Sequence, residues 1–186
     1  IETACSAALV AVCGALTSVR VRESDASVVA GVNLMLTPTV SKRFSLAGMT
    51  STSGRCLTFD QRANGYARAE SCCSMFLAGV LHGCAEVSEA CTQQDGKSSS
   101  LTAPNGKSQQ RLLDETSSRA GTQLEACEAH GTGTSLGDPI EMGALAAVIG
   151  EGRSEDCPLV MGAVKANVGH LEPAAGLAGL IKAVLV

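Results

Sequence analysis

The amino-acid sequence predicts a layered α/β fold, and three observations support this. Short apolar runs of strand length alternate with longer segments of helical character along the 186 residues. Hydrophobic residues make up 45% of the chain and charged residues only 17%, so the chain can bury a core and is not disordered. Aromatic residues make up only 2%, so the core consists of small side chains that let helices and sheets approach closely.

The first half of the chain begins with a helix and a strand. Residues 6–19 are apolar, rich in alanine and of helical length, and residues 26–33 (ASVVAGVN) form a valine-rich run bounded by polar residues. Residues 37–66 are rich in Ser, Thr, Gly and Arg, which predicts irregular structure with at most one helical turn. The remaining expectations are strands at 72–81 and 86–92 and a turn-forming segment at 93–106.

The second half repeats the alternation. We expect helices at 108–120, 138–149 and from Pro173 to the end, strands at 124–129 and 159–164, and a loop at 165–172. Gly121 is placed to end the first of these helices. Asp138, Pro139 and Glu141 have the spacing of an N-cap, a first-turn proline and a capping-box partner.

Composition disfavours several classes of function. The net charge is −4 and tryptophan is absent, so neither a basic field nor aromatic stacking favours nucleic-acid binding. The longest apolar stretch, residues 7–16, is shorter than the roughly 20 residues that a membrane-spanning helix needs. The chain starts without methionine and ends in an apolar run, so we expect a fragment of a longer protein.

The 9 cysteines are odd in number and lie mostly in apolar runs. Reduced, buried cysteines acting as small hydrophobes fit this pattern better than a disulfide scaffold. No paired C-x-x-C spacing is present, so no metal site is expected. Together with the lack of a visible signal peptide, this predicts an intracellular, cytoplasmic protein.

Cys5 is the exception among the cysteines, because it lies where an apolar helix begins. Free N–H groups at a helix N-terminus favour a thiolate and can hold an oxyanion. Cys5 is therefore a candidate nucleophile, the alternative being a buried cysteine at a helix start.

Two of the three histidines, His130 and His170, each follow a predicted strand and lie beside glycine. A neutral imidazole in such a place can act as a general base or donate a hydrogen bond to an enolate. Lys165 lies five residues before His170 and is a candidate to orient it; the alternatives are two loop histidines and a surface lysine. His82 is expected to be structural or at the surface. The glycines of residues 131–137 match no nucleotide-binding motif, so no nucleotide cofactor is expected.

Three long motifs carry a family resemblance: TACSAALVA at 3–11, EAHGTGTSLGDPIE at 128–141 and VKANVGHLEPAAGLAGLIK at 164–182. GVN at 31–33, GRCLTFD at 54–60 and LTAPNG at 101–106 occur between them in the matching order. In these motifs the chain resembles the β-ketoacyl synthase domains of the thiolase superfamily. Type I polyketide synthases are most similar, followed by animal fatty-acid synthases.

The resemblance implies a thiolase-like α-β-α-β-α fold with two similar halves, each a mixed five-stranded sheet covered by helices. Residues 1–106 would end the N-terminal half, with Cys5, and residues 107–186 would begin the C-terminal half, with both histidines. Such domains usually form homodimers. The chain would lack the start of the first half and a glycine-rich C-terminal segment, so it would be an incomplete enzyme.

The resemblance also implies a decarboxylative Claisen condensation. No cofactor would be bound directly, because acyl carrier protein presents each thioester on its own phosphopantetheine arm. Cys5 would accept the acyl chain, and His130 and His170 would assist decarboxylation of a malonyl-type extender. Lys165 would organise the histidines. The family positions imply further that Asp138 and Glu141 help to hold this lysine and that Thr132 and Thr134 contact the phosphopantetheine arm.

One departure from the family pattern leaves alternatives open. Residues 69–73 read AESCC where the family has a glycine-rich GEGCG, which predicts altered packing there. A non-elongating, decarboxylating domain and a degenerate domain that only docks carrier proteins both remain as alternatives. A cysteine hydrolase fits less well, because two histidines and Lys165 suit carbon–carbon bond formation better than a Cys-His-Asn arrangement does.

Overall fold

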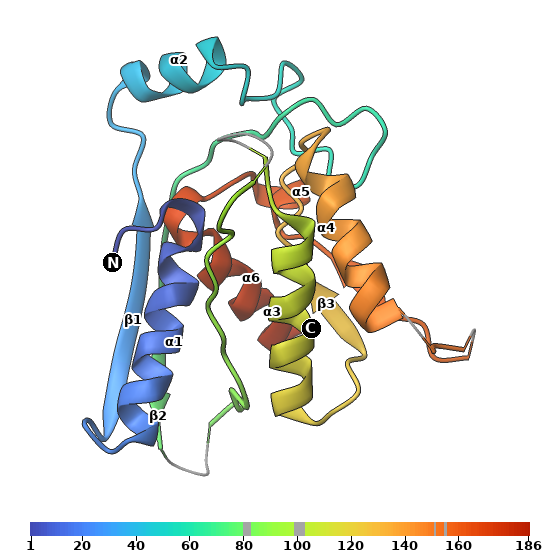
Figure 1. The fold of residues 1–186 in the computed structure, drawn as a ribbon. Helices are drawn as coiled ribbons and strands as arrows, with labels where there is room; N and C mark the ends of the chain where they lie inside the picture. The colour runs from blue at the N-terminus through green and yellow to red at the C-terminus, as the bar shows by residue number, and fades with distance from the viewer. Residues whose placement is uncertain (80–82, 99–102, 151, 155) are drawn as a thin grey trace.

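The computed structural model describes residues 1–79, 83–98, 103–150, 152–154 and 156–186 (Figure 1). Its α-helices are α1 (Ala7–Arg20), α2 (Pro38–Leu46), α3 (Gly106–Ala120), α4 (Gly137–Leu145), α5 (Lys165–Val168) and α6 (Ala175–Leu185). Its strands are β1 (Ala26–Asn33), β2 (Ser71–Ala78), β3 (Ala126–Glu128) and β4 (Val160–Gly162). Two 3₁₀ turns, η1 (Ala4–Ser6) and η3 (Glu172–Ala174), precede α1 and α6, and a π-helical turn, η2 (Ala146–Gly150), follows α4.

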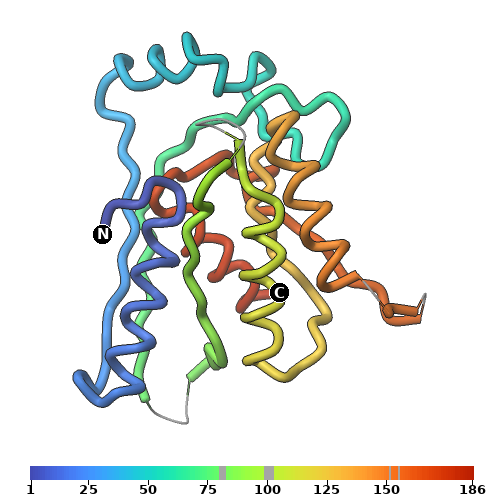
Figure 2. Tube along the Cα trace, in the orientation of Figure 1, coloured from blue at the N-terminus to red at the C-terminus, as the bar shows by residue number. Residues whose placement is uncertain are grey.

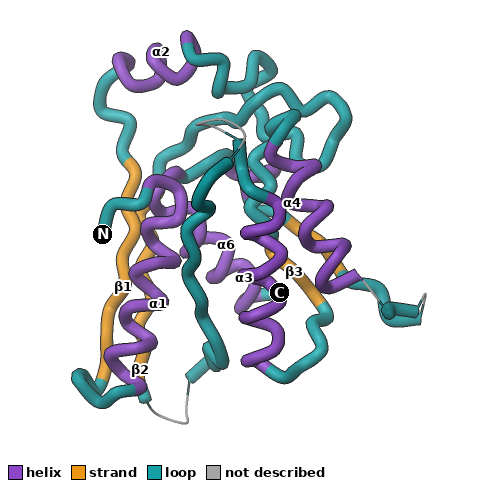
Figure 3. The backbone as a smooth tube through the Cα atoms, in the orientation of Figure 1, coloured by secondary structure: helices purple, strands orange, loops and turns teal. Residues whose placement is uncertain are grey.

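The described strands form two small sheets, which Figure 3 shows in orange. β1 and β2 pair antiparallel along their whole length, with Ala26 opposite Ala78 and Asn33 opposite Ser71. β3 and β4 pair in parallel, with Glu128 opposite Gly162. Helix α6 contacts β1, β2 and β3, so it is the element that joins the two sheets.

The main apolar core lies between β1, α1 and α6. Ala8 and Val12 of α1, Val29 of β1 and Leu177 of α6 are its buried members. Gly31 of β1 faces the same layer, and a Cβ built on it would lie 2.9 Å from the Cα of Ala174. Small residues therefore let the sheet, α1 and η3 come into backbone contact, as the composition predicts.

The layered α/β class and most of the expected elements are confirmed. The helix at 6–19 and the strand at 26–33 correspond to η1–α1 and β1. The helix at 108–120 is α3, and Gly121 ends it in the left-handed conformation with φ 64°. The strands at 124–129 and 159–164 are present as the shorter β3 and β4.

Residues 37–66 hold more helix than expected. Pro38 occupies the first turn of the 9-residue helix α2, where its fixed φ and missing N–H are favourable, and the turn-rich composition hides this start. The segment 165–172 is likewise not all loop, since α5 forms one turn there and η3 begins at Glu172.

The strand expected at 86–92 is wrong, because this segment contacts a helix and joins neither described sheet. The Cys13 thiol donates to the Ala90 carbonyl at 3.4 Å, and the Arg20 guanidinium donates to the Ser88 carbonyl. Figure 2 shows the segment running in an extended form beside α1. Its contacts are with a helix and not with a strand, and an apolar run alone could not distinguish the two cases.

The capping arrangement expected at Asp138 is also wrong. Helix α4 begins at Gly137 with Leu136 as N-cap, and the Thr134 hydroxyl, not the Asp138 carboxylate, accepts the Gly137 N–H at 3.2 Å. The carboxylates of Asp138 and Glu141 bond instead to backbone N–H groups of neighbouring loops. A long-range partner has replaced the local one that the spacing predicts.

All nine cysteines lie in described residues and are free, but their expected burial is only partly right. Cys56 is buried, whereas Cys72 and Cys84 are exposed. Cys72 is exposed because alternation along β2 turns it away from α1 and α6. Altered packing is expected at residues 69–73 (AESCC). There, Ala69 packs against the buried cluster that contains Leu171 and Ala174, and β2 pairs with β1 from Ser71 onward.

Some expectations fall on residues outside those described. They are His82, the end of the strand expected at 72–81, and parts of the turn segment 93–106 and of the motif at 101–106. Within the described ranges, every helix is too short or too polar to cross a membrane. The described strands account for part of the two five-stranded sheets that the family resemblance implies.

Truncation of Leu177 tests the placement of the core. Leu177 is 0% exposed, so we expect Leu177→Ala to lower the free energy of unfolding by about 2–5 kcal/mol through lost contacts and a residual cavity. Leu46→Ala is the matched control, because Leu46 is 79% exposed and its truncation should change stability by no more than about 0.5 kcal/mol. Urea unfolding followed by circular dichroism measures both. Equal losses in the two variants would contradict the core described above.

Candidate active site

Three side chains from distant parts of the sequence converge at the junction of the two sheets. The Cys5 sulfur and one ring nitrogen each of His130 and His170 all lie within 4.8 Å of one another. The two imidazole rings meet edge to face, with centroids 5.6 Å apart and an interplanar angle of 89°. The two histidines are therefore both close enough to act on a group attached to the Cys5 sulfur.

Cys5 lies within η1, directly before α1. Ala4 before it has φ 53°, a conformation that costs energy for a residue with a side chain and that is found at functional sites. Burial raises the pKa of the Cys5 thiol, while the Cys5 backbone and the charge of Lys165 act in the opposite direction. The acidified thiol expected from a helix N-terminus is thus not found, because loss of hydration outweighs the local dipoles. A base is needed to take its proton.

His170 is fixed by main-chain pairing with the segment that leads into β2. The His170 N–H donates to the Ala67 carbonyl at 2.6 Å, and the Ala69 N–H donates to the His170 carbonyl at 3.0 Å. Gly169 adopts φ 85°, and a Cβ on it would lie 3.1 Å from the Ala67 oxygen. Only glycine allows this close approach, which explains the glycine beside the histidine. The ring of Tyr66 lies edge-on to His170 at 5.0 Å.

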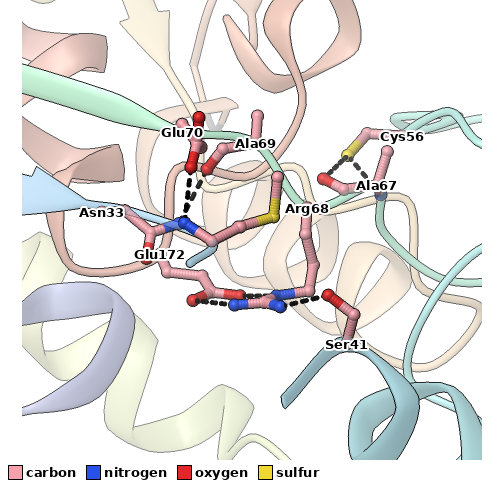
Figure 4. A network of polar contacts seen from close by, with 9 residues as sticks. Asn33, Ser41, Cys56, Ala67, Arg68, Ala69, Glu70 and Glu172 are labelled. Atoms are coloured by element: carbon pink, nitrogen blue, oxygen red, sulfur yellow. Dashed lines mark hydrogen bonds and ion pairs between the residues drawn. The ribbon is translucent and has the colours of Figure 1, made fainter. Parts of the chain in front are cut away.

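An ion pair reinforces this pairing (Figure 4). The Arg68 guanidinium binds both carboxylate oxygens of Glu172 and donates to the Ser41 hydroxyl of α2 at 2.6 Å. The ring of Phe44 lies 5.2 Å from the guanidinium. Arg68 follows Ala67 directly and Glu172 lies two residues after His170, so this bidentate pair resists separation of the two segments.

His130 lies in the loop after β3, and a carboxylate of α4 shapes that loop. Glu141 accepts the N–H groups of His130 and Gly131 at 2.6 and 2.8 Å. Asp138, which is buried, accepts those of Gly133 at 3.1 Å and Phe59 at 2.8 Å. The expected role of these acids in holding Lys165 stays a prediction, although the Glu141 charge raises the pKa of this lysine.

Lys165 opens α5 and is only 4% exposed. Burial lowers the pKa of its ammonium group, and the charges of Glu141, Cys5, Glu128 and Cys56 oppose that shift. Its carbonyl accepts the Gly169 N–H at 2.9 Å, so Lys165 and His170 belong to one turn.

Both histidines favour the neutral form at pH 7. Burial and then the charge of Lys165 lower the pKa of His170 to about 4. Burial, Lys165 and His170, in that order, lower the pKa of His130 to about 3. His130 as a residue remains exposed, so water screens part of this interaction. Neutral imidazoles can each donate one hydrogen bond or accept a proton.

Thr132 and Thr134 continue the loop that carries His130. Thr132 is 8% exposed, and the two hydroxyl oxygens lie 3.2 Å apart. A pocket of about 290 Å³ opens beside Thr134, with Phe59, Ala63 and Met142 among its lining residues. The sequence-predicted residues Cys5, His130, His170 and Lys165 are thus brought together, with the threonines along one side.

Sequence reasoning missed several residues that shape the site. Two of these residues carried a signal in the sequence that could have identified them. Tyr66 is the only tyrosine of the chain, and Glu172 lies two residues after His170. Arg68 and Cys56 carried no such local signal; the Cys56 sulfur accepts the Ala67 N–H at 3.3 Å and so supports the segment that pairs with His170.

Zinc also binds to thiol and imidazole donors. Among the described residues, Cys5, His130 and His170 are the three such donors that lie close together. Such donors also suit thioester and enolate chemistry. The Nδ1 atom of His170 is buried and has no hydrogen-bond partner among the described residues.

Comparison with known proteins agrees with this geometry. The sequence model of the family "Beta-ketoacyl synthase, N-terminal domain" matches residues 1–81, and that of "Beta-ketoacyl synthase, C-terminal domain" matches residues 84–186. The chain therefore belongs to the β-ketoacyl synthase family of condensing enzymes. The division near residue 106 that we expected from the resemblance stays a prediction.

The curated relatives and solved structures are polyketide synthases. The chain is 45% identical to a highly reducing polyketide synthase of Aspergillus terreus and 49% identical to a component of the phenolphthiocerol/phthiocerol polyketide synthase of Mycobacterium tuberculosis. Each match covers 100% of this chain but only 7% and 9% of the relative. The ketosynthase from module 6 of the Bacillus subtilis bacillaene synthase superposes with a TM-score of 0.95 at 36% identity, over 100% of this chain and 35% of that one. The thiolase-like fold is confirmed.

The lowered pKa of His170 predicts a pH-dependent stability. The imidazole has a pKa of about 4 in the folded protein and its ordinary value of 6.5 when unfolded. Between these values the unfolded chain binds a proton that the folded protein does not, so the free energy of unfolding falls as the pH is lowered through this range. Urea unfolding across this range measures the slope. His170→Gln removes this titration and should flatten the slope; an unchanged slope would contradict a buried, neutral His170.

Proposed function

We propose that this chain carries the catalytic residues of a β-ketoacyl synthase of polyketide biosynthesis, an acyltransferase that extends an acyl chain by decarboxylative Claisen condensation. The observation that supports this most directly is the meeting of the Cys5 sulfur with the His130 and His170 imidazoles within 4.8 Å. A thiol forms thioesters readily, and two neutral imidazoles suit an enolate that develops beside it.

The first step is acyl transfer to Cys5. The sulfur attacks the thioester carbonyl of an acyl carrier protein, its proton passes to a neutral imidazole, and the carrier leaves as the free thiol after receiving a proton. The raised pKa of Cys5 makes this base necessary. The backbone N–H groups at the start of α1 supply positive partial charge for the oxyanion of the tetrahedral intermediate.

The second step forms the carbon–carbon bond. The malonyl-type carrier thioester loses CO₂, and His130 and His170 donate hydrogen bonds to the enolate oxygen that results. The enolate carbon attacks the Cys5 thioester carbonyl, the carbon–sulfur bond breaks, and the Cys5 thiolate leaves and is reprotonated. The product is a β-ketoacyl carrier protein. Burial, together with the charge of Lys165, keeps both imidazoles uncharged and thus able to act as neutral donors.

The partner is an acyl carrier protein whose phosphopantetheine arm brings each thioester to Cys5. Thr132 and Thr134 are proposed to contact this arm, supported by their place beside His130 and by the pocket at Thr134. No other cofactor enters the reaction. The active form is a homodimer inside the cell, and nine free cysteines support the intracellular location.

Acylation of Cys5 tests the nucleophile. After incubation with a short acyl thioester, intact mass and peptide mapping should find one acyl group on Cys5 and none in Cys5→Ala. Cys72→Ala is the matched control, because Cys72 is an exposed thiol and its loss should leave acylation unchanged. Failure of the complete protein to acylate Cys5 would favour a degenerate, carrier-docking domain.

The histidines and Lys165 should separate the two steps. We expect His130→Ala, His170→Ala and Lys165→Ala each to keep acylated Cys5 detectable but to slow release of CO₂ from malonyl carrier protein by about 10²–10⁴-fold, since enolate stabilisation is lost. Lys107→Ala, which changes an exposed lysine of α3, should match the wild type. Release of CO₂ without an elongated product in the wild type would identify the non-elongating alternative instead.

A further inference from the structure

Glu128, the last residue of β3, has no part in the steps above, yet it contacts both segments that carry the catalytic groups of the C-terminal half. We propose that Glu128, paired with Lys182 of α6, is a positioning residue that holds the His130 loop and the Lys165 turn in fixed relation to each other. This inference rests on the proposed condensing function.

The two oxygens of the Glu128 carboxylate have different partners. Oε1 accepts the N–H of Val164, the residue before Lys165. Oε2 receives the ammonium group of Lys182 at 2.6 Å. The Glu128 side chain is only 12% exposed, so this charge-assisted contact is poorly screened by water. One side chain thus connects the end of β3, the start of α5 and the last turn of α6.

Two glycines provide the room that this pair occupies. A Cβ on Gly162, which lies opposite Glu128 in the parallel sheet, would lie 2.8 Å from the Lys182 nitrogen and 3.2 Å from the Glu128 Oε2. A Cβ on Gly179 of α6 would lie 3.1 Å from the Glu128 Cγ. Both β4 and α6 therefore lack a side chain at the place where the Glu128–Lys182 pair lies, so the fold accommodates it closely.

The position of the pair along the chain connects it to catalysis. Glu128 lies two residues before His130, and its partner Val164 lies one residue before Lys165. The Ala129 N–H, between Glu128 and His130, donates to the Gly162 carbonyl at 2.7 Å. Any shift of the carboxylate would thus move both loops, and small displacements of catalytic groups slow reactions strongly.

The charge of Glu128 also acts on Lys165 directly. Burial lowers the pKa of Lys165, and Glu128 is one of the groups that raise it. The titratable groups that face Lys165 are Glu141, Cys5, Glu128, Cys56, His130 and His170. Removing the Glu128 charge should let Lys165 lose its proton at a lower pH, whereas removing Lys182 leaves Glu128 free to act on Lys165 more strongly.

The test compares Glu128→Gln and Lys182→Met in the complete protein, using malonyl carrier protein and acylated Cys5. We expect Glu128→Gln to lower kcat for CO₂ release by about 10- to 100-fold with KM and Cys5 acylation unchanged, because geometry and not binding is lost. The alkaline limb of its pH–rate profile should move to lower pH. Lys182→Met should move that limb to higher pH, an opposite shift that loss of packing alone would not produce.

Glu115→Gln and Arg119→Met are matched controls, because Glu115 and Arg119 form an exposed ion pair on α3 with side chains 48% and 55% exposed. Both should leave kcat and the pH profile unchanged. Wild-type kcat and an unmoved alkaline limb in Glu128→Gln would overturn the proposal. If Glu128→Gln unfolds, Lys182→Met decides alone, because it keeps the bond from Glu128 to Val164. A wild-type protein that fails to acylate Cys5 would refute the proposed function instead.

Discussion

The buried ammonium group of Lys165 is the constraint around which the rest of the site is arranged. A positive charge that is 4% exposed needs negative groups nearby, and the charges of Glu141 and Glu128 supply them. Burial lowers the pKa of both histidines, and the charge of Lys165 lowers it further, while the same charge opposes the effect of burial on the Cys5 thiol. One buried lysine thereby acts on the protonation equilibria of all three neighbouring groups.

The side chains of the proposed active site are held in place by segments that contribute none of these side chains. The strand-like segment at 67–69 pairs with His170 on both sides, and Arg68 strengthens this pairing through Glu172. Asp138 joins the loop that carries the threonines after His130 to the Phe59 N–H. Residues from the middle of the chain thus contact both the motif at 128–141 and the motif at 164–182, which explains why an irregular stretch rich in Ser, Thr and Gly has well-defined contacts.

Much of this arrangement could be predicted from the sequence. Periodicity and composition identify the helix after Cys5, the strand at 26–33 and the helix that Gly121 ends, because each depends on local pattern. The glycine beside each histidine could be noted in the sequence, but the protein segments that approach it could not. The hydrogen-bond partners of Asp138 and Glu141 could not be predicted. The spacing of a capping motif depends only on nearby residues, whereas the N–H groups that bond to these carboxylate oxygens belong to other loops of the chain. The segment at 86–92 could not be told from a strand, because packing against α1 needs the same apolar residues that a sheet would.

The backbone contact at Gly31 links the core to the spacing of the site. Ala8, three residues after Cys5, and Ala174, four residues after His170, both lie where a side chain at this glycine would point. The spacing between the start of α1 and η3 therefore depends here on three of the smallest residues. A larger side chain at Gly31 would force the two segments apart and so separate Cys5 from His170 without touching either residue.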